Sequence, residues 1–310
     1  MGTPSQAERV LVTGASGFIG GHLRAELGRR GFEVVTLARD QLDGPCLDVT
    51  ADGSEENWVD ALQGIAAVIH LAGVAHRQAT QDEYERINVA WPVKLQRAAA
   101  QADVQSLVIM SSIKVLGDAS RQPFRESDGY REDDDPYGLS KIRMEQTLLA
   151  EETVGAGPTC AVVRTPLVYG PGVKANFLAL LSWADRASRG LPLPFGRATA
   201  PRSFIGVRNL CDLLIASIGH HGIVHGADLQ DLSLRELLLQ LGVAPGRLLP
   251  VPPVLLRSLL AAVGRRSLYE RLFGPLQLAQ AESNARLGWT PPHGSAEQLE
   301  ETLAWYRSRT

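Results

Sequence analysis

The segment Val10-Leu11-Val12-Thr13-Gly14-Ala15-Ser16-Gly17-Phe18-Ile19-Gly20 carries the strongest indication of the fold. It joins a short apolar run to three glycines spaced three residues apart, and a helical pattern follows. Glycines permit a tight turn and a close approach of the backbone to phosphate, while a helix start offers free N–H groups and the positive end of a dipole. The segment therefore predicts a dinucleotide-binding turn built on Gly14, Gly17 and Gly20.

The same alternation of a short apolar run with a helical pattern continues through the first half of the chain. The apolar runs are continuous, which is typical of parallel strands buried on both faces, and they lie at 10–12, 33–37, 67–71, 107–110 and 161–164. Helical patterns lie between them near 19–30, 55–63, 82–102 and 136–154. This order predicts an α/β fold with a doubly wound, Rossmann-type parallel sheet.

Beyond Gly172 the pattern becomes less regular, with clusters of Pro and Gly at 190–196 and 245–253. The run 203–207 and the apolar helix expected near 209–217 predict a return of the chain to the main sheet. We therefore expect a Rossmann domain over 1–170, with a return segment near 202–226. A smaller C-terminal substrate domain is expected from the separated segments 171–201 and 227–310.

The composition excludes several classes of function. The chain has 310 residues, 45% hydrophobic composition and a formal net charge of −3, with no dense Lys/Arg cluster along the sequence that would indicate nucleic-acid or membrane binding. The isolated Cys46, Cys160 and Cys211 lack metal-ligand spacing, so we expect reduced, partly buried cysteines and no metal site. Residues 1–9 do not resemble a signal peptide, and we expect a cytoplasmic protein.

The stretch 248–263 is rich in Leu but contains three prolines and Arg257, and it is too short to span a bilayer, so no stable membrane insertion is expected. Two interpretations remain open for its part 254–263. An amphipathic helix packed against a core is favoured, and a loose contact with a membrane or a partner is the alternative.

Tyr137 and Lys141 are four residues apart in Asp-Pro-Tyr-Gly-Leu-Ser-Lys, so a helix places them on one face. A neighbouring ammonium favours the ionised phenol and would lower the pKa of Tyr137 toward the range useful for proton transfer. Lysine is scarce, with four residues against 27 arginines, which indicates that Lys141 is needed as lysine. Together with the glycine turn, the pair points to a nicotinamide-dependent redox enzyme.

The end of the second strand indicates which nicotinamide cofactor is preferred. An acidic residue at this place binds the ribose 2′-hydroxyl of NAD, whereas this chain has Ala38 followed by Arg39. A guanidinium suits a 2′-phosphate, so NADPH is the expected cofactor. The alternative is that Asp40 takes the acidic role and NAD binds. Asp48 and Val49 are expected at the adenine edge.

With these motifs described, the chain resembles an extended short-chain dehydrogenase/reductase of the NAD-dependent epimerase/dehydratase family. The resemblance covers nearly the whole chain and rests on five motifs in order: the glycine turn 13–20, His-Leu-Ala-Gly at 70–73, Ser-Ser-Ile-Lys-Val-Leu-Gly at 111–117, Tyr137 to Lys141, and Arg-Thr-Pro-Leu-Val-Tyr-Gly-Pro-Gly at 164–172. It implies a Rossmann domain with a small nucleotide-sugar domain, and a homodimer formed through two long helices.

The resemblance also implies roles for single residues. Ser112 joins Tyr137 and Lys141 as the third catalytic residue, its hydroxyl bonding the reacting sugar oxygen. Contacts to a UDP-sugar are implied for Ser112, His76, Asn176 and Arg202. The cofactor-binding residues expected from the motifs are Gly14, Gly17, Phe18, Ile19, Gly20, Arg39, Asp48, Val49, Leu71, Ala72, Gly73, Tyr137, Lys141, Pro166 and Val168.

Further motifs resemble a subgroup of bacterial polysaccharide-pathway (O-antigen type) enzymes that act as 4-epimerases or 4-reductases. The leading hypothesis is an NADPH-dependent 4-reductase of a UDP-4-keto-6-deoxy-N-acetylhexosamine. The alternative is an NAD-dependent UDP-sugar 4-epimerase of the UDP-glucose or UDP-N-acetylglucosamine type, although Ile113-Lys114-Val115-Leu116 departs from the Ala-Thr-Val-Tyr of UDP-galactose 4-epimerases. A non-catalytic cofactor-binding protein is a further alternative, which the intact Ser112, Tyr137 and Lys141 disfavour.

Overall fold

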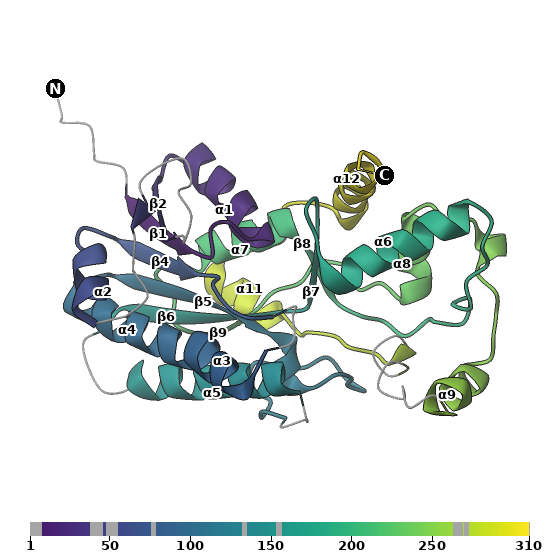
Figure 1. Cartoon of the computed structure of the whole chain (residues 1–310), viewed down its shortest axis with the longest axis horizontal. Coiled ribbons are helices and arrows are strands. Elements are labelled where there is room, and N and C mark those ends of the chain that lie inside the picture. Colours follow the sequence, from purple (N-terminus) through teal and green to yellow (C-terminus); the bar gives the residue numbers. More distant parts are fainter. Residues whose placement is uncertain are drawn as a thin grey trace.

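The computed structural model describes residues 8–37, 46–47, 55–75, 79–131, 135–152, 157–262, 269 and 273–309 (Figure 1). Its strands are β1 (Arg9–Thr13), β2 (Glu33–Leu37), β3 (Cys46–Leu47), β4 (Ala67–His70), β5 (Ser106–Ser112), β6 (Thr159–Thr165), β7 (Leu167–Tyr169), β8 (Phe204–Gly206) and β9 (Gly222–His225). Its α-helices are α1 (Phe18–Arg29), α2 (Glu55–Ala61), α3 (Gln81–Tyr84), α4 (Trp91–Gln101), α5 (Pro136–Glu152), α6 (Ala175–Ser188), α7 (Val207–Ala216), α8 (Leu234–Gln240), α9 (Pro253–Ala262), α11 (Ala281–Leu287) and α12 (Ser295–Arg307). A π-helical turn η1 (Glu85–Ala90) and the 3₁₀ turns η2 (Ile113–Leu116) and η3 (Pro245–Arg247) complete the described elements.

Seven strands form one parallel sheet in the order β3-β2-β1-β4-β5-β6-β9, so the predicted doubly wound fold is confirmed. The order reverses direction at β1, because β2 and β3 lie on one side of it and β4, β5, β6 and β9 on the other. In register, Thr13 of β1 pairs with His70 of β4. Because parallel strands end at the same edge, the glycine turn, the segment after His70 and Ser112 at the end of β5 come together there.

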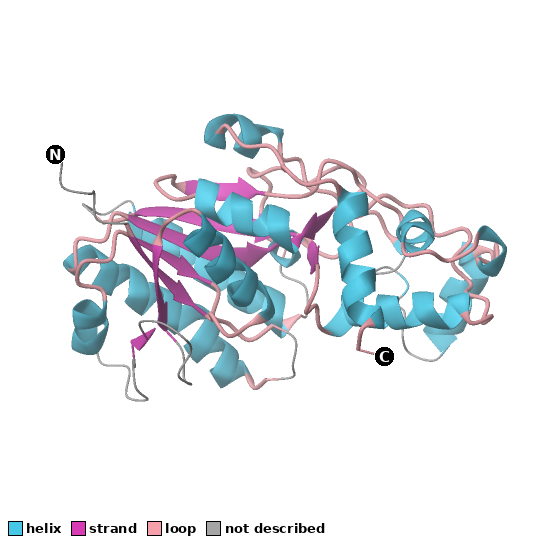
Figure 2. Cartoon of the chain, turned by 90° about the horizontal axis from the view of Figure 1, so that it is seen from above, coloured by secondary structure: helices cyan, strands magenta, loops and turns pink. Residues whose placement is uncertain are grey.

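Two apolar layers enclose the sheet, one on each face (Figure 2). One layer packs α1 and α7 against the strands through Leu23, Leu27, Leu210 and Leu214. The other packs α2, α4 and α5, with Leu95 and Leu148 fully buried. Burial of both faces explains why the strands read as continuous apolar runs. The side chains of Cys160 and Cys211 are buried in these layers.

A further apolar cluster lies beyond the carboxyl edge of the sheet, in the half of the molecule that holds α6 and α8 (Figure 1). It is centred on Phe177, Leu181, Leu237 and Leu238. The residues that build it come from separated stretches of the chain, and the assignment of 171–201 and 227–310 to nucleotide-sugar binding remains a prediction.

The expected return of residues 203–207 to the main sheet is wrong in one respect. Phe204–Gly206 forms β8, which pairs with β7 in a separate two-stranded sheet. Pro166 separates β6 from β7 and has no N–H to donate, so the chain leaves the main sheet at that residue. The helix that follows β8, α7, does pack on the main sheet beside α1, and β9 then adds its last strand.

The described side chains of helix α9 do not pack into an apolar cluster, whereas the sequence favours a helix packed against a core. None of its described side chains belongs to any of the four apolar clusters, and Val254 and Leu255 are 75% and 61% exposed. Within the described ranges no helix is long and apolar enough to cross a membrane.

Candidate functional site

The glycine turn has the geometry of a phosphate cradle. Gly14 adopts a left-handed φ of +67°, and a Cβ there would lie 2.8 Å from the backbone nitrogen of Ala72. A Cβ on Gly20 would lie 2.3 Å from the carbonyl oxygen of Gly14. Gly17 caps α1 without a side-chain acceptor, so the first N–H groups of the helix can bind an anion. These residues fit a dinucleotide pyrophosphate.

A buried hydrogen bond joins the turn to the neighbouring strand. The hydroxyl of Thr13 lies 2.8 Å from Nδ1 of His70 and accepts the N–H of Ala72 at 3.2 Å. Burial, followed by the charge of Lys141, lowers the pKa of His70 to about 3, so this ring is neutral at physiological pH. The two strand ends are thereby held together, and the backbone of Leu71 and Ala72 lies beside Gly14 of the turn. The cofactor-binding role of Leu71, Ala72 and Gly73 stays a prediction.

Ser112 and Tyr137 meet at the end of β5. The Ser112 hydroxyl is hydrogen-bonded to the phenol of Tyr137, and its oxygen also accepts the N–H of Lys114 at 3.3 Å. Tyr137 is in the first turn of α5, the helix that packs on one face of the sheet through Met144 and Leu148. The structure therefore brings together Ser112 and Tyr137, which are 25 positions apart in the chain.

The pKa of Tyr137 is raised, which contradicts the lowering expected from the sequence. Removal of the phenol from water raises the pKa of Tyr137 to about 12; the hydrogen bond from Ser112 lowers it, while Asp135 and Tyr84 raise it further. Lys141 is indeed on the same helix, but its Nζ donates to the carbonyl of Met110 at 2.9 Å. Burial outweighs the charges around the phenol.

Lys141 is itself buried, and this changes its own titration. Burial lowers the pKa of Lys141 to about 8, opposed by the carboxylate of Glu145. A Cβ on Gly73 would lie 3.9 Å from Nζ of Lys141, so the expected cofactor-binding glycine directly faces the ammonium. The ammonium is therefore placed between the catalytic helix and the cofactor side of the edge.

Asn88 is a site residue that the sequence reasoning missed. Its amide accepts the N–H of Val74 at 2.8 Å and donates to the carbonyl of Val74 at 3.0 Å and to Ser140 at 2.9 Å. Ser140 in turn donates to the carbonyl of Tyr137 at 2.7 Å. Asn88 lies in the π-helical turn η1, and such turns are frequent at functional sites. The network ties the segment after Gly73 to the catalytic helix.

Behind the site lies a buried ion pair that was also missed. Arg164 of β6 donates to Glu145 of α5 at 2.7 Å, and both side chains are at most 1% exposed. Ser111 donates to the same carboxylate. The pair fixes α5 on the sheet, and therefore the position of Tyr137 and Lys141.

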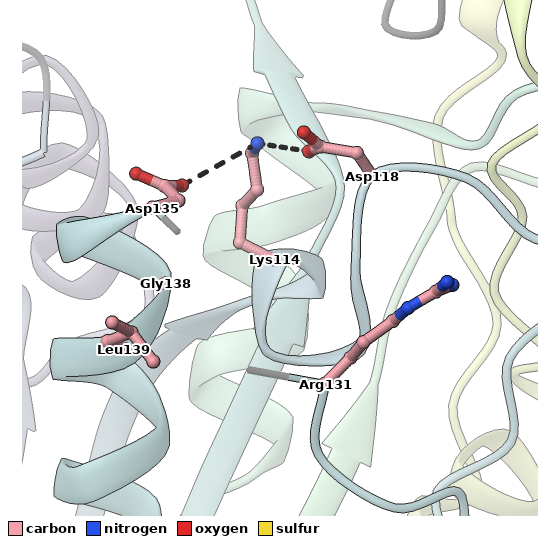
Figure 3. Close-up of a pocket in the computed structure, with 6 residues that line it drawn as sticks. All are labelled: Lys114, Asp118, Arg131, Asp135, Gly138 and Leu139. Carbon is pink, nitrogen blue, oxygen red and sulfur yellow. Dashed lines mark hydrogen bonds and ion pairs between the residues drawn. The ribbon is translucent and has the colours of Figure 1, made fainter. Parts of the chain in front are cut away.

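Lys114 lies between the turn after Ser112 and the start of the catalytic helix (Figure 3). Its ammonium pairs with Asp118 and lies 3.6 Å from Asp135, whose carboxylate accepts the N–H of Tyr137 at 3.3 Å. Figure 3 shows Lys114 between these two carboxylates, in a small pocket lined by Lys114, Asp118, Arg131, Asp135, Gly138 and Leu139. The lysine thus connects the turn after Ser112 to the start of α5.

The predicted substrate contacts lie farther out. Asn176 is exposed in the first turn of α6. Arg202 is partly buried and donates to the carbonyl of Gly274. Burial lowers the pKa of Arg202, and the charge of Asp118, which follows the turn after Ser112, raises it, so Arg202 lies toward the catalytic edge. Neither residue contacts Ser112 or Tyr137 in any interaction that the structure describes, and their role remains a prediction.

The glycine turn contacts the segment that follows β6. Phe18 comes from the turn, and Pro166 and Val168 come from that segment. The ring of Phe18 lies against Gly170 and Gly172, where an added Cβ would be 3.5 Å and 3.4 Å from it, and Ile19 is partly buried on the sheet core. Val168 pairs with Ile205, while Pro166 is buried. Arg39, Asp48, Val49 and His76 lie outside the described residues. The preference for NADPH is therefore untested.

The parallel sheet, the glycine turn at its carboxyl edge and the Ser112, Tyr137 and Lys141 set define an NAD(P)-dependent enzyme of the extended short-chain dehydrogenase/reductase type. Residues 10–229 match the model of the NAD dependent epimerase/dehydratase family, and the chain belongs to this family.

Two similar proteins cover nearly the whole chain, and a third covers slightly more than half of it. A UDP-glucose 4-epimerase from Vibrio cholerae is 31% identical over 97% of this chain and 96% of its own. The structure of MoeE5 in complex with UDP-glucose and NAD has a TM-score of 0.74 and 27% identity over 97% of this chain and 99% of its own. A dTDP-4-dehydrorhamnose reductase from Mycobacterium tuberculosis is 29% identical over 57% of this chain and 55% of its own.

Proposed function

We propose that the protein is an NAD-dependent 4-epimerase of a UDP-hexose, of the UDP-glucose or UDP-N-acetylglucosamine type. One observation carries the proposal: the Ser112–Tyr137 pair lies in a chain 31% identical, over 97% of its length, to the Vibrio cholerae UDP-glucose 4-epimerase. The likeness to MoeE5 with UDP-glucose and NAD supports the same substrate class. This replaces the 4-reductase as the leading hypothesis.

The cofactor would be held by the glycine turn and by the segment that Thr13 and His70 align beside it. When bound, NAD supplies a reversible hydride acceptor for C4 of the sugar. The ammonium of Lys141, opposite Gly73, is placed to bond the ribose hydroxyls next to the nicotinamide. The side chains of this protein bind the sugar and transfer the proton.

Tyr137 takes the proton from the sugar O4 hydroxyl as C4 loses its hydride, and returns it after the opposite face of the 4-keto sugar has turned toward the cofactor. A phenol with a pKa near 12 is a poor acceptor at neutral pH. Positive charge next to the phenol lowers that pKa. Lys141 can supply such charge below about pH 8, where its own pKa leaves it protonated.

Ser112 orients the reacting oxygen. Its hydroxyl already bonds Tyr137, and the N–H of Lys114 holds its oxygen, so the sugar O4 would join an existing chain of hydrogen bonds. The guanidinium of Arg202 is suited to the diphosphate, and holding it would leave the sugar free to rotate. Asn176 is proposed as a second contact to the nucleotide sugar.

A 4-reductase remains the second candidate. Arg39 follows the second strand, where a 2′-phosphate reader is expected, and Lys114 stands where UDP-galactose 4-epimerases have Thr. The likeness to a dTDP-4-dehydrorhamnose reductase over 57% of the chain also favours reduction at C4. In that reaction Tyr137 donates a proton once, and the oxidised cofactor leaves after each turnover.

The test is to denature the freshly purified protein, identify any released nucleotide, and incubate native protein with UDP-glucose or UDP-N-acetylglucosamine without added reductant. We expect about one NAD per chain and formation of the 4-epimer. A cofactor-free protein that consumes NADPH only with a UDP-4-keto-6-deoxy-N-acetylhexosamine would instead establish the reductase. A protein that binds NAD or NADPH but converts none of these sugars would favour the non-catalytic alternative.

A further inference from the structure

Helix α9 presents apolar side chains to solvent without a described partner. Val254 and Leu255 are 75% and 61% exposed, and Arg257 and Ser258 beside them are also exposed. Single exposed Leu residues need no explanation, but adjacent exposed Val and Leu on a helix whose described side chains lie outside the apolar clusters require one.

The chain before α9 extends the same surface. Leu249 is paired by backbone hydrogen bonds with Leu193, and Arg247 donates to the carbonyl of Gly190 at 2.9 Å. These bonds join the segment that carries the exposed Leu191 to the segment that carries the exposed Leu249, four residues before α9 begins. We define the α9 surface as Leu191, Leu249, Val254 and Leu255, with the exposed cations Arg189, Arg247 and Arg257.

The charge of the two segments that supply this surface is one-sided. Segments 186–197 and 241–262 contain five arginines and neither Asp nor Glu, in a chain whose net charge is −3. Asp185, at the border of the first segment, pairs with Arg189 at 3.1 Å, so Arg247 and Arg257 carry the excess positive charge of the α9 surface. The two segments are far apart in sequence, so the cluster is not visible along the chain. Hydrogen bonds between them assemble it.

We propose that the α9 surface binds the surface of an anionic lipid bilayer, with α9 lying in the interface. Exposed Leu and Val would enter the acyl boundary while the arginines meet anionic headgroups, which is the pattern of a peripheral amphipathic helix. A ten-residue helix is about 15 Å long, half of the ~30 Å apolar core, so it lies on the bilayer and does not cross it.

A second copy of the chain fits this surface less well. A two-fold contact would set Arg247 and Arg257 of one copy against those of the other, and the one carboxylate that borders the surface, Asp185, is already paired with Arg189. The proposal is independent of the reaction, because none of these residues belongs to the catalytic or cofactor-binding set.

The test is co-sedimentation of the full chain with vesicles of phosphatidylcholine alone or with about one third phosphatidylglycerol. We expect at least tenfold tighter binding to the anionic vesicles, weakened by salt because the headgroup attraction is screened. Leu255→Asp and Arg257→Glu should each lower that binding severalfold. Leu229→Asp changes a Leu that is 68% exposed outside the α9 surface, and should leave it unchanged.

Equal binding to both vesicles, no binding, or equal loss in all three variants would overturn the proposal. Sedimentation equilibrium without lipid tests whether a second copy of the chain binds this surface. If the protein does not bind vesicles but self-associates, and Leu255→Asp abolishes the self-association, the surface is a dimer interface. Retained cofactor binding and an unchanged melting temperature show that each variant is folded.

Discussion

The Nζ of Lys141 lies 2.9 Å from the carbonyl oxygen of Met110, which joins the second turn of the catalytic helix to strand β5 two residues before Ser112. The bond places a cation at the sheet edge, inside the protein and 6% exposed. Because Lys141 is held by the strand that carries Ser112, the two residues keep their spacing. The position serves catalysis and opposes stability.

Lys141→Met is expected to abolish turnover and to raise stability near pH 7. The pKa of Lys141 is about 8 in the folded protein against an ordinary 10.5, so the unfolded chain binds the proton more tightly. Below pH 8 the buried charge of Lys141 therefore lowers the free energy of unfolding by its full amount. This effect fades between pH 8 and 10.5. Removing the charge should stabilise by about 2–3 kcal/mol at pH 7. Urea unfolding at pH 7 and pH 10 would show the gain at the lower pH only; a loss of stability at pH 7 contradicts it.

Tyr137→Phe should lower turnover by about 10²–10⁴-fold, because it removes the proton acceptor. Binding of NAD should be nearly unchanged, since the glycine turn is intact. Tyr306→Phe alters a partly buried phenol in α12 and serves as the control. Steady-state rates with fluorescence titration of NADH separate the two effects. Full activity in Tyr137→Phe would exclude the proposed role.

Gly20→Ala and the adjacent Gly21→Ala should change the free energy of unfolding in opposite directions. The new Cβ at position 20 would meet the backbone of Gly14 at 2.3 Å, whereas nothing lies within 4 Å at position 21. The first should destabilise by about 1–3 kcal/mol and weaken cofactor binding at least tenfold. The second should stabilise α1 by about 0.5–1 kcal/mol and leave binding intact. Thermal unfolding with cofactor titration checks both, and similar affinities in the two variants would refute the cradle.

Glu145→Gln should destabilise by about 3–5 kcal/mol, because it leaves Arg164 as a buried charge without its carboxylate. The matched control is Glu85→Gln, which breaks an ion pair with Arg143 whose side chains are 45–48% exposed. That change should cost no more than about 1 kcal/mol. Chemical denaturation of both variants gives the comparison. Equal midpoints would mean that the buried pair does not anchor α5.

Acid should destabilise the protein below pH 6.5 through two buried histidines. Burial lowers the pKa of His70 to about 3 and that of His225 to about 4, so both stay neutral when folded and gain a proton when unfolded. Stability from these groups is complete above pH 6.5 and falls by about 1.4 kcal/mol per pH unit for each below it. His225→Gln should remove the contribution of one histidine to this pH dependence of stability, whereas His221→Gln, at an exposed position, should leave it unchanged. Denaturation midpoints from pH 7 to pH 5 measure the slopes.

Local sequence determined the elements that carry the site. The glycine spacing from Gly14 to Gly20 is itself a requirement of the turn, since two of these positions have no room for a Cβ. Continuous apolar runs indicated strands buried on both faces, and the four-residue spacing of Tyr137 and Lys141 placed both on one helix. Such patterns are readable because periodicity and conformational freedom depend on neighbouring residues only.

Tertiary structure alone decided what surrounds those elements. Asn88 meets Ser140 from 52 residues away, and Glu145 meets Arg164 across a helix and a strand. The raised pKa of Tyr137 and the lowered pKa of Lys141 follow from burial, which sequence spacing does not report. The sequence favoured packing of α9 against a core, because an apolar run has the same sequence pattern whether its side chains are buried in the protein or exposed to solvent. Burial, pairing and pKa depend on which distant segments pack together, and that is settled only when the chain has folded.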